Sequence, residues 1–248
     1  MTVFTPPKEV KDIIGFGTSG LVGDISDSEV LKMYKPGDQE STNEINREIL
    51  IYKTLGSHEN IMGFIEASEH GVKLERMKHG NVRSYLSSND VEMGDRVKWC
   101  KQMCRGLAHI HERGVFHCDL NGSNVFIDKN FNLKIGDFAG SCNQNTESLV
   151  LEGARYYLPR EDWTPTAKSE IFAAGSTMYE IMQGEKPYEY LDDKEVEKRY
   201  KSQEFPDTSC IPYVGEIIRN CWFQRYESAD ELVQAICSVE AEAINKAA

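Results

Sequence analysis

The spacing of apolar residues changes its period once along this chain, and that change limits the folds it can form. Over about the first 75 residues, short apolar stretches such as Val30-Leu31 stand between Gly, Asp and Ser residues. This pattern is typical of strands joined by turns. Residues 43–55 differ, because Ile45, Ile49 and Leu55 recur there at helical spacing. The first third is therefore predicted to be strands around one helix.

After residues 78–81 the pattern becomes helical. A stripe of apolar residues at helical spacing runs over residues 99–110, and residues 171–182 are apolar nearly all round, as in a buried helix. Ser228 and Glu231 form a capping-box pattern that opens a last helix. The sequence therefore predicts an α+β fold with two lobes, a small strand-rich one with one helix and a larger helical one. Ligands tend to bind in the cleft between such lobes.

Composition excludes several classes of partner. The 248 residues carry 28 basic and 40 acidic side chains, a formal net charge of −12. Nucleic acids and acidic membrane surfaces attract basic proteins, so neither is expected as the main partner. Apolar residues make up 40% of the chain, which is too many for a disordered protein.

The cysteines and the N-terminal residues indicate in which cellular compartment the protein is expected. The seven cysteines are odd in number and include no Cys-x-x-Cys pair, so reduced thiols are expected. No leader is visible in the first residues, and no apolar run approaches the ~18 residues needed to span a bilayer. We expect a cytoplasmic monomer, although a secreted protein trimmed from a precursor would give the same sequence.

A glycine-rich run suggests a phosphate site. It reads Gly15-Phe-Gly17-Thr-Ser-Gly20-Leu-Val22 and lies between two strand-like stretches. Glycines let the backbone approach a phosphate and direct N–H groups toward it. Alone, the run fits an ordinary hairpin equally well. A dinucleotide-binding fold would need a helix next, whereas residues 23–28 are typical of a turn.

A lysine follows on the next predicted strand. Lys32 could reach the phosphates of a nucleotide if a carboxylate held it in place, and Glu48 on the predicted helix is the candidate. By itself such a pair is more often a solvated surface pair.

The spacing of three polar residues carries more information. Asp119 is followed five residues later by Asn124, and Asp137 comes thirteen residues after that, in Asp-Phe-Ala-Gly. The strand-like residues 125–127 and 133–135 flank the connection. This arrangement places a base and two Mg²⁺ ligands around one point, which suits phosphoryl transfer.

With these motifs together, the chain resembles the eukaryotic protein kinase family, in particular its tyrosine-kinase-like branch of serine/threonine type. The likeness runs from the glycine loop through His58-Glu-Asn-Ile61 to Cys221-Trp222 and Arg225. It implies one protein kinase domain over residues 1–248. The N-lobe with the hinge would span residues 1–77 and the C-lobe residues 78–248.

The resemblance also implies roles for individual residues. Asp119 would accept the proton of a protein hydroxyl, and Asn124 and Asp137 would hold Mg²⁺. ATP would be the second substrate, with Ser or Thr favoured as acceptor. The other implied roles concern the nucleotide. Gly15, Gly17 and Gly20 would cover its phosphates, and Lys32, paired with Glu48, would bind them. Leu74 would be the gatekeeper and Glu75 to Met77 the hinge, while Val22, Val30 and Phe126 would enclose the adenine.

The chain departs from this family at the catalytic loop. Serine/threonine kinases carry a Lys two residues after the Asp, and tyrosine kinases an Arg two or four residues after it. Here those positions are Asn121 and Ser123, and Ala154 stands where a supporting Thr is usual. Losing one such preorganised charge typically reduces the rate by about 10²–10³-fold. A pseudokinase, acting by binding a nucleotide or a partner, is therefore the alternative.

Other departures concern the surroundings of the loop. Cys118 replaces the Arg that normally receives an activating phosphate, so a switch of another kind is expected. Ala139 replaces a glycine, which should make the Asp-Phe unit flip outward less readily. Glu170 replaces the Asp that anchors the loop, and Glu161 could still pair with Arg225 or lie at the surface.

Some residues admit a second interpretation. His109 and His111 could bind a metal but are more typical of packing, and His117 is expected to support the loop from the core. Cys118 is either a buried filler or a redox-sensitive thiol. The charged residues 192–201 predict a solvated helix or a docking surface. A small-molecule phosphotransferase shares a similar Asp…Asn…Asp core, but the glycine loop and the Cys-Trp…Arg ending argue against it.

Overall fold

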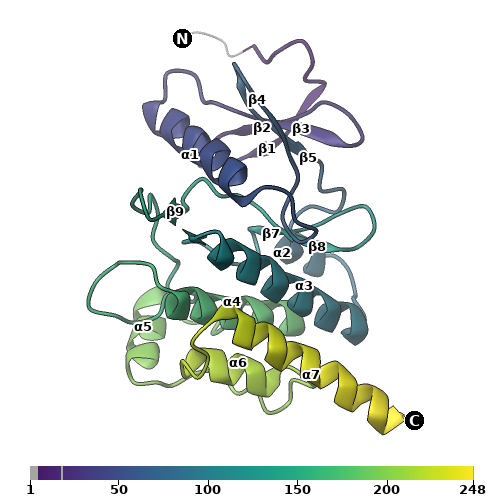
Figure 1. The fold of residues 1–248 in the computed structure, drawn as a ribbon, viewed down its shortest axis with the longest axis vertical. Coiled ribbons are helices and arrows are strands. Elements are labelled where there is room, and N and C mark those ends of the chain that lie inside the picture. Colours follow the sequence, from purple (N-terminus) through teal and green to yellow (C-terminus); the bar gives the residue numbers. More distant parts are fainter. Residues whose placement is uncertain (1–4, 18, 248) are drawn as a thin grey trace.

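The computed structural model describes residues 5–17 and 19–247. Residues 1–4, 18 and 248, which the predicted domain includes, lie outside the described residues. A sheet with one helix lies at one end of the elongated molecule and a group of helices at the other (Figure 1). The predicted α+β fold with a strand-rich and a helical part is therefore confirmed. No helix among the described residues is long and apolar enough to cross a membrane.

The strand-rich part is an antiparallel sheet with the order β1-β2-β3-β5-β4. The strands fall at the predicted apolar stretches, because each stretch ends at residues that favour turns. Their bounds are β1 (Asp12–Phe16), β2 (Leu21–Asp24), β3 (Glu29–Met33), β4 (Phe64–Ser68) and β5 (Gly71–Glu75).

Helix α1 (Gln39–Leu55) packs against this sheet and begins four residues before the predicted start at residue 43. The reason is the cap, since the side chain of Asp38 accepts a hydrogen bond from the Ser41 N–H at 3.1 Å. Ile45 and Leu55 are buried, as their spacing indicated.

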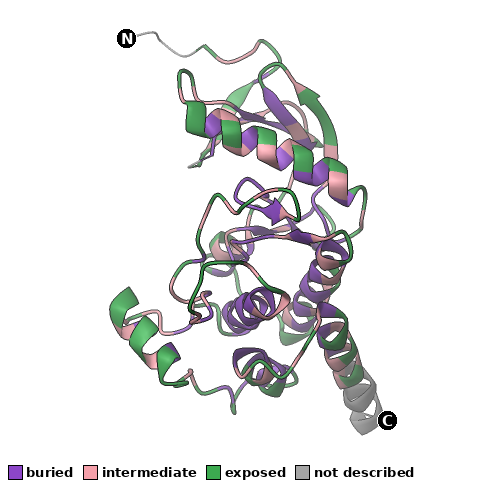
Figure 2. Ribbon diagram, turned by 60° about the vertical axis from the view of Figure 1, so that its left-hand side comes forward, coloured by how far each residue is buried: buried purple, intermediate pink, exposed green. Residues whose placement is uncertain are grey.

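The helical part is built around α4 (Ala167–Gln183), which packs against α3 (Met93–Glu112) and α6 (Gly215–Trp222). Every residue from 169 to 182 is buried, so the prediction of a buried helix is confirmed (Figure 2). The other helices are α2 (Val82–Leu86), α5 (Asp193–Lys201) and α7 (Ala229–Ala247). Helix α7 packs along α3 and is preceded by Ser228, whose hydroxyl accepts the Glu231 N–H at 3.3 Å.

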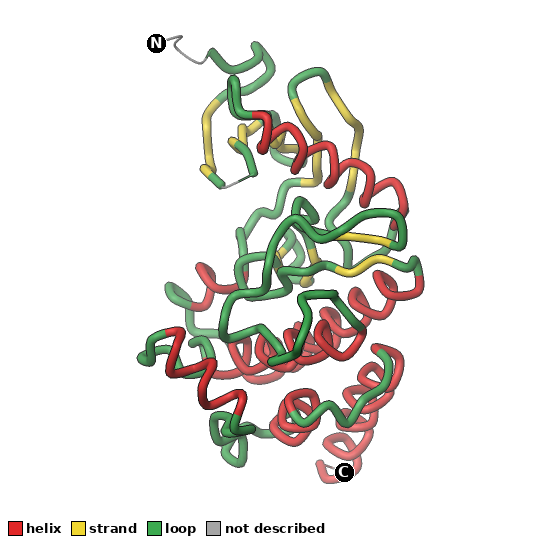
Figure 3. The backbone as a smooth tube through the Cα atoms, turned by 90° about the vertical axis from the view of Figure 1, so that its left-hand side faces the viewer, coloured by secondary structure: helices red, strands yellow, loops and turns green. Residues whose placement is uncertain are grey.

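Short strand pairs and long loops lie between the sheet and the helices (Figure 3). The pairs are β6 (Val115–Phe116) with β9 (Cys142–Asn143) and β7 (Val125–Ile127) with β8 (Leu133–Ile135). A parallel bridge from Ile61 to Ile135 ties β8 to the chain that leads into β4. Residues 117–124 and 136–141, which connect these short strands, are thereby held between the two parts.

Candidate active site

Lys32 stands between two carboxylates that come from distant parts of the chain. Its Nζ lies 2.7 Å from Oε2 of Glu48 on α1 and 2.6 Å from Oδ1 of Asp137, just after β8. Lys32 is 7% exposed and Glu48 fully buried. The pairing of Lys32 with Glu48 is therefore a buried contact and not a solvated surface pair.

Lys32 and Asp137 each favour the charged form of the other. Burial alone would lower the pKa of the Lys32 ammonium, but the charges of Glu48 and Asp137 outweigh it and raise that pKa. Burial would raise the pKa of Asp137, but the charge and hydrogen bond of Lys32 hold it below its ordinary value. Lys32 and Asp137 therefore face each other as ions at neutral pH.

Two asparagines hold Asp119. The Nδ2 of Asn124 donates to Oδ2 of Asp119 at 2.8 Å and to its backbone oxygen at 2.7 Å. The Nδ2 of Asn121 donates to the other carboxylate oxygen, Oδ1, at 3.0 Å. Burial raises the pKa of Asp119 despite these hydrogen bonds. Both carboxylate oxygens are thus fixed by amides of the same loop.

Glu170 fixes the start of the loop. Its two carboxylate oxygens accept the backbone N–H groups of His117 and Cys118, each at 2.8 Å. The longer side chain therefore makes the anchoring contacts that were expected of an Asp at this position. His117 is fully buried, and its Nε2 lies 3.0 Å from the carbonyl oxygen of Gly136, so the predicted supporting role of this histidine is confirmed.

A cavity of about 300 Å³ opens beside Lys32. Glu75, Arg76 and Met77 are among the residues that line it, and the Glu75 carboxylate accepts from Lys134 Nζ at 2.7 Å and from the Gly63 N–H. Most of the residues expected around a nucleotide line this cavity, namely Gly15, Val22, Val30, Lys32, Glu48, Leu74, Glu75, Met77, Phe126 and Asp137.

The remaining predicted residues lie outside the lining of this cavity. Gly17 and Gly20 close the β1–β2 hairpin, where the Gly17 N–H donates to the Gly20 carbonyl at 2.9 Å. A side chain at residue 20 would meet the carbonyl oxygen of Met33, so this turn requires glycine there. Asp119 and Asn124 belong to the loop that follows β6.

Sequence reasoning missed Arg83 on α2. Its guanidinium donates to Ser123 Oγ at 2.5 Å and to Asn121 Oδ1 at 3.2 Å. It also binds both carboxylate oxygens of Glu180 on α4, at 2.5 and 3.1 Å, and the hydroxyl of Tyr156 at 2.9 Å. One signal could have found it: a carboxylate inside the apolar run 171–182 needs a cation as partner.

Two further expectations have clear outcomes. Glu161 and Arg225 are both exposed, and no ion pair joins them among the described residues; Glu152 instead pairs with Arg160 at 3.0 Å. Of the two predictions for Glu161, a pair with Arg225 or a position at the surface, the second is therefore correct. His109 is buried, stacks on His58 with ring centroids 4.4 Å apart and bonds the Leu55 carbonyl oxygen, so it packs as expected.

Sequence also missed the contacts of Cys118. This residue is buried, as the filler interpretation predicted, and its Sγ lies 3.5 Å from Sγ of Cys142 on β9. Within the residues that the structure describes, no group of three or more His, Cys, Asp or Glu side chains forms a metal site.

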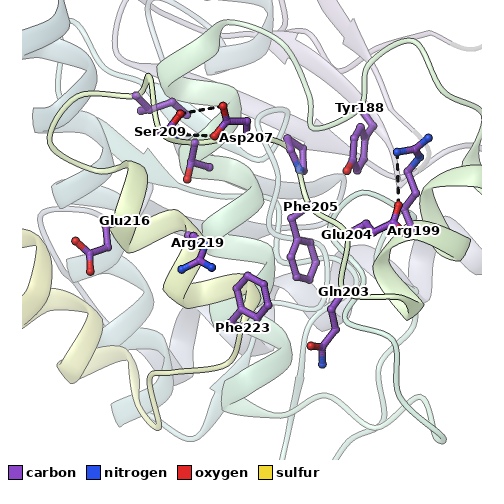
Figure 4. Close-up of a pocket in the computed structure, with 13 residues that line it drawn as sticks. Tyr188, Arg199, Gln203, Glu204, Phe205, Asp207, Ser209, Glu216, Arg219 and Phe223 are labelled. Carbon is purple, nitrogen blue, oxygen red and sulfur yellow. Dashed lines mark hydrogen bonds and ion pairs between the residues drawn. The ribbon is translucent and has the colours of Figure 1, made fainter.

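A larger cavity, of about 750 Å³, lies elsewhere, between α5 and α6 (Figure 4). Several of its charged side chains have partners of their own. Arg199 faces Glu204 at 3.7 Å, and the Asp207 carboxylate accepts from the Ser209 hydroxyl at 2.8 Å. It contains none of the residues around Lys32. The smaller cavity therefore remains the candidate active site.

Comparison with known proteins agrees with this geometry. The protein kinase domain family matches residues 8–243. The serine/threonine-protein kinase shk1/pak1 of Schizosaccharomyces pombe is 29% identical over 172 residues, 65% of this chain and 26% of the relative. CST20 of Candida albicans, also a serine/threonine-protein kinase, is 28% identical over 194 residues, 71% of this chain and 16% of the relative.

A third relative, the cell cycle serine/threonine-protein kinase CDC5/MSD2 of Saccharomyces cerevisiae, is 28% identical over 195 residues, 73% of this chain and 28% of the relative. The chain therefore spans less than a third of the length of these relatives. The narrower placement in the tyrosine-kinase-like branch stays a prediction. The match over residues 8–243 shows that the chain belongs to the protein kinase family.

Proposed function

We propose that this chain is an ATP-dependent protein kinase that transfers the γ-phosphate to a protein hydroxyl, with Ser or Thr as acceptor. The observation that carries the proposal is the position of Lys32 Nζ, within 2.7 Å of Glu48 and 2.6 Å of Asp137. A buried lysine held by a carboxylate of the helix beside a cavity fits the lysine that holds the nucleotide phosphates in protein kinases. The serine/threonine-protein kinases among its relatives favour the acceptor type.

The proposal covers the whole chain as one kinase domain over residues 1–248, with lobes 1–77 and 78–248. Its partners would be ATP and a protein substrate, and we place it in the cytoplasm as a monomer.

The donor atoms around Asp137 fit Mg²⁺. Asn124 uses its Nδ2 on Asp119, which leaves Oδ1 for a metal, and Asp137 uses Oδ1 on Lys32, which leaves Oδ2. Amide and carboxylate oxygens are the ligands that this cation takes. When bound, Mg²⁺ neutralises negative charge on the phosphates.

Protein residues would carry out the other parts of the reaction. Lys32 would hold the phosphates, positioned by Glu48. Asp119 would accept the proton of the substrate hydroxyl, with the amides of Asn121 and Asn124 fixing the carboxylate. The hinge backbone from Glu75 to Met77, at the edge of the cavity, would recognise adenine.

A transfer assay tests this proposal. Phosphate transfer from γ-labelled ATP with Mg²⁺ to a panel of protein substrates is expected for the wild type. The transfer should be lost in Asp119→Asn and Lys32→Met, two variants of nearly unchanged size. Lys53→Met, which removes an exposed lysine from α1, is the matched control and should transfer normally. Equal signals from the wild type and Asp119→Asn would refute the proposal.

A second candidate is a kinase-shaped module that binds nucleotide without useful turnover. Asn121, Ser123 and Ala154 favour it, because the loop itself lacks a cation and its usual supporting Thr. A ligand that binds only the native state raises the melting temperature. An ATP-dependent shift that Lys32→Met abolishes, without any phosphate transfer, would favour this candidate.

A further inference from the structure

We propose that Arg83 of α2 takes over the task of the cation that is missing from the catalytic loop, as a positioning residue for Asp119. The inference rests on the proposed kinase activity. The two loop positions at which the family carries a cation are Asn121 and Ser123, and one guanidinium binds both side chains, at 3.2 and 2.5 Å.

The guanidinium is itself held in place. Glu180, whose side chain is 2% exposed, binds it through both oxygens, and the Glu180 Oε2 also accepts the Gly122 N–H at 3.0 Å. The Tyr156 hydroxyl donates to the same oxygen at 2.5 Å. Arg83 therefore joins α2, α4 and the loop at a fixed point, as bidentate Arg–carboxylate pairs do.

A chain of contacts leads from Arg83 to the reacting group. Arg83 donates to Oδ1 of Asn121, which orients the amide so that its Nδ2 donates to Oδ1 of Asp119 at 3.0 Å. Arg83 also neutralises Glu180. Without it, a buried carboxylate would add negative charge next to the loop that must face ATP.

Three variants test this role. Arg83→Ala should reduce kcat by about 10–10²-fold and leave the Kd for ATP, measured by nucleotide titration, within about twofold of the wild type. Arg83→Lys keeps the charge but loses the bidentate geometry, so an intermediate kcat is expected. In an Asn121→Ala background, Arg83→Ala should reduce kcat by less than it does in the wild type, because Arg83 acts on Asp119 through the Asn121 amide.

The matched control is Arg96→Ala. Arg96 also binds the same helix α4, through the carbonyl oxygens of Ile181 and Met182 at 2.8 and 3.1 Å, but it does not contact the loop. This variant should reduce the melting temperature with kcat unchanged. A wild-type kcat in Arg83→Ala, or an undiminished loss of kcat from Arg83→Ala in the Asn121→Ala background, would overturn the inference.

Hydrogen exchange separates this inference from the proposed function. If the wild type transfers no phosphate, the proposed function fails, but exchange still reports on the contacts. Backbone exchange at residues 121–124 should accelerate in Arg83→Ala and not in Arg96→Ala. Equal exchange in the two variants would count against Arg83 as the residue that fixes the loop.

A second inference comes from a different observation and does not depend on kinase activity. We infer that Cys118 and Cys142 form a peroxide-driven disulfide that links the catalytic loop to the segment after Asp137. Their Sγ atoms lie 3.5 Å apart, and both residues are buried. An approach of about 1.5 Å would bring the sulfur atoms to bonding distance.

The surroundings favour Cys142 as the attacking thiol. It lines a cavity of about 480 Å³ that a peroxide can enter. The thiol contact with Cys118 lowers the pKa of Cys142, against the raising effects of burial and of the Glu170 charge, and the Arg47 charge adds to the lowering. Cys118 lines no part of this cavity, so it would act as the resolving thiol.

The reaction balances with hydrogen peroxide as the oxidant. The Cys142 sulfur attacks one peroxide oxygen, the O–O bond breaks, and the other oxygen leaves as water, which gives a sulfenic acid. The Cys118 sulfur then attacks Sγ of Cys142, the S–O bond breaks, and a second water leaves. Two thiols are oxidised and one peroxide is reduced.

The bridge would restrain segments that other contacts already join. Ser141 Oγ donates to the His117 carbonyl oxygen at 2.9 Å, and Arg47 of α1 donates to the Ser141 carbonyl oxygen at 2.7 Å. The family uses an Arg at residue 118 and a phosphate on the segment for this purpose. Here a covalent bond between the same two segments would replace that ionic contact.

Peptide mapping tests the second inference. After peroxide treatment, mass spectrometry should find a peptide that links Cys118 to Cys142 and that dithiothreitol removes, and exchange at residues 141–153 should slow. Cys142→Ser should abolish both effects. Cys210→Ser, which removes an exposed thiol elsewhere, should retain them. Oxidised wild type without this linked peptide, or the same slowing in Cys142→Ser, would overturn the inference.

Discussion

Lys32 Nζ lies 2.7 Å from Oε2 of Glu48, and the exposed fraction of the Glu48 side chain is zero. The two residues come from β3 and α1, so the contact fixes the helix against the sheet. Because Lys32 also binds Asp137, one ammonium group joins the sheet, the helix and the segment after β8. The position of Lys32 is therefore tied to the orientation of α1.

We expect Glu48→Gln to reduce kcat/KM for ATP by about 10²-fold, since it removes a preorganised charge and leaves Lys32 to Asp137 alone. Steady-state kinetics with varied ATP would measure this. Glu40→Gln, an exposed residue in the first turn of α1, is the control and should behave as the wild type. Unchanged kinetics in Glu48→Gln would show that the pair does not align Lys32.

We expect Arg47→Met to loosen the segment after Asp137. Its Nη1 donates to the carbonyl oxygens of Ser141 and Glu147, at 2.7 and 2.6 Å. Losing both hydrogen bonds should accelerate limited proteolysis within residues 141–153. Lys53→Met removes an exposed cation from the same helix and should not change the cleavage rate. Equal rates for the two variants would contradict a tethering role for Arg47.

The sequence predicted contacts whose partners lie in regular elements. Lys32 and Glu48 lie on a predicted strand and a predicted helix, but the residues alone left a surface pair open, and their pairing was predicted from the resemblance to the family. The start of α1 was missed by four residues, since a cap depends on one side chain, here Asp38, and not on a period.

Contacts between loops and short helices could not be predicted from the periodicity of the sequence. Arg83 and Glu180 are 97 residues apart, and no period relates a five-residue helix to α4. The Cys118–Cys142 contact depends on the pairing of two short strands, β6 and β9. Glu152 forms an ion pair with Arg160, which lies close to it in the sequence. The resemblance to the family concerned Glu161 and did not indicate this pair.

We expect Gly122→Ala to disturb the loop, because a Cβ at this residue would meet the buried carboxylate of Glu180. Arg83 and Tyr156 hold that carboxylate, so it cannot move away freely. Overpacking of this kind should reduce the free energy of unfolding by about 1–3 kcal/mol, and kcat should fall with it. Chemical denaturation and a transfer assay would measure the two effects.

The control for this variant is Gly94→Ala in α3, where a Cβ would meet no atom within 4 Å. Alanine favours a helix over glycine, so this change should increase the free energy of unfolding by about 0.5–1 kcal/mol. If both variants gained stability, the space beside Gly122 would be larger than the structure indicates.

We expect the contribution of Glu170 to stability to depend on pH. Burial alone would raise the pKa of this carboxyl, but the nearby His111 ring, whose Nε2 lies 3.5 Å from Oε2, and the backbone N–H of His117 hold the pKa below its ordinary value of 4.5. A group whose pKa is depressed by folding stabilises the native state above its unfolded pKa, and this stabilisation is lost as the pH falls through the folded pKa.

Comparison of the wild type with Glu170→Gln by denaturation across the pH range tests this. At pH 7 the variant should be less stable by about 2–3 kcal/mol, because an amide cannot accept both N–H groups of the loop. The difference should stay constant down to about pH 5 and shrink below pH 4.5 as the wild-type carboxylate is protonated. A difference that persisted unchanged at low pH would show that Glu170 stabilises the loop by its shape and not by its charge.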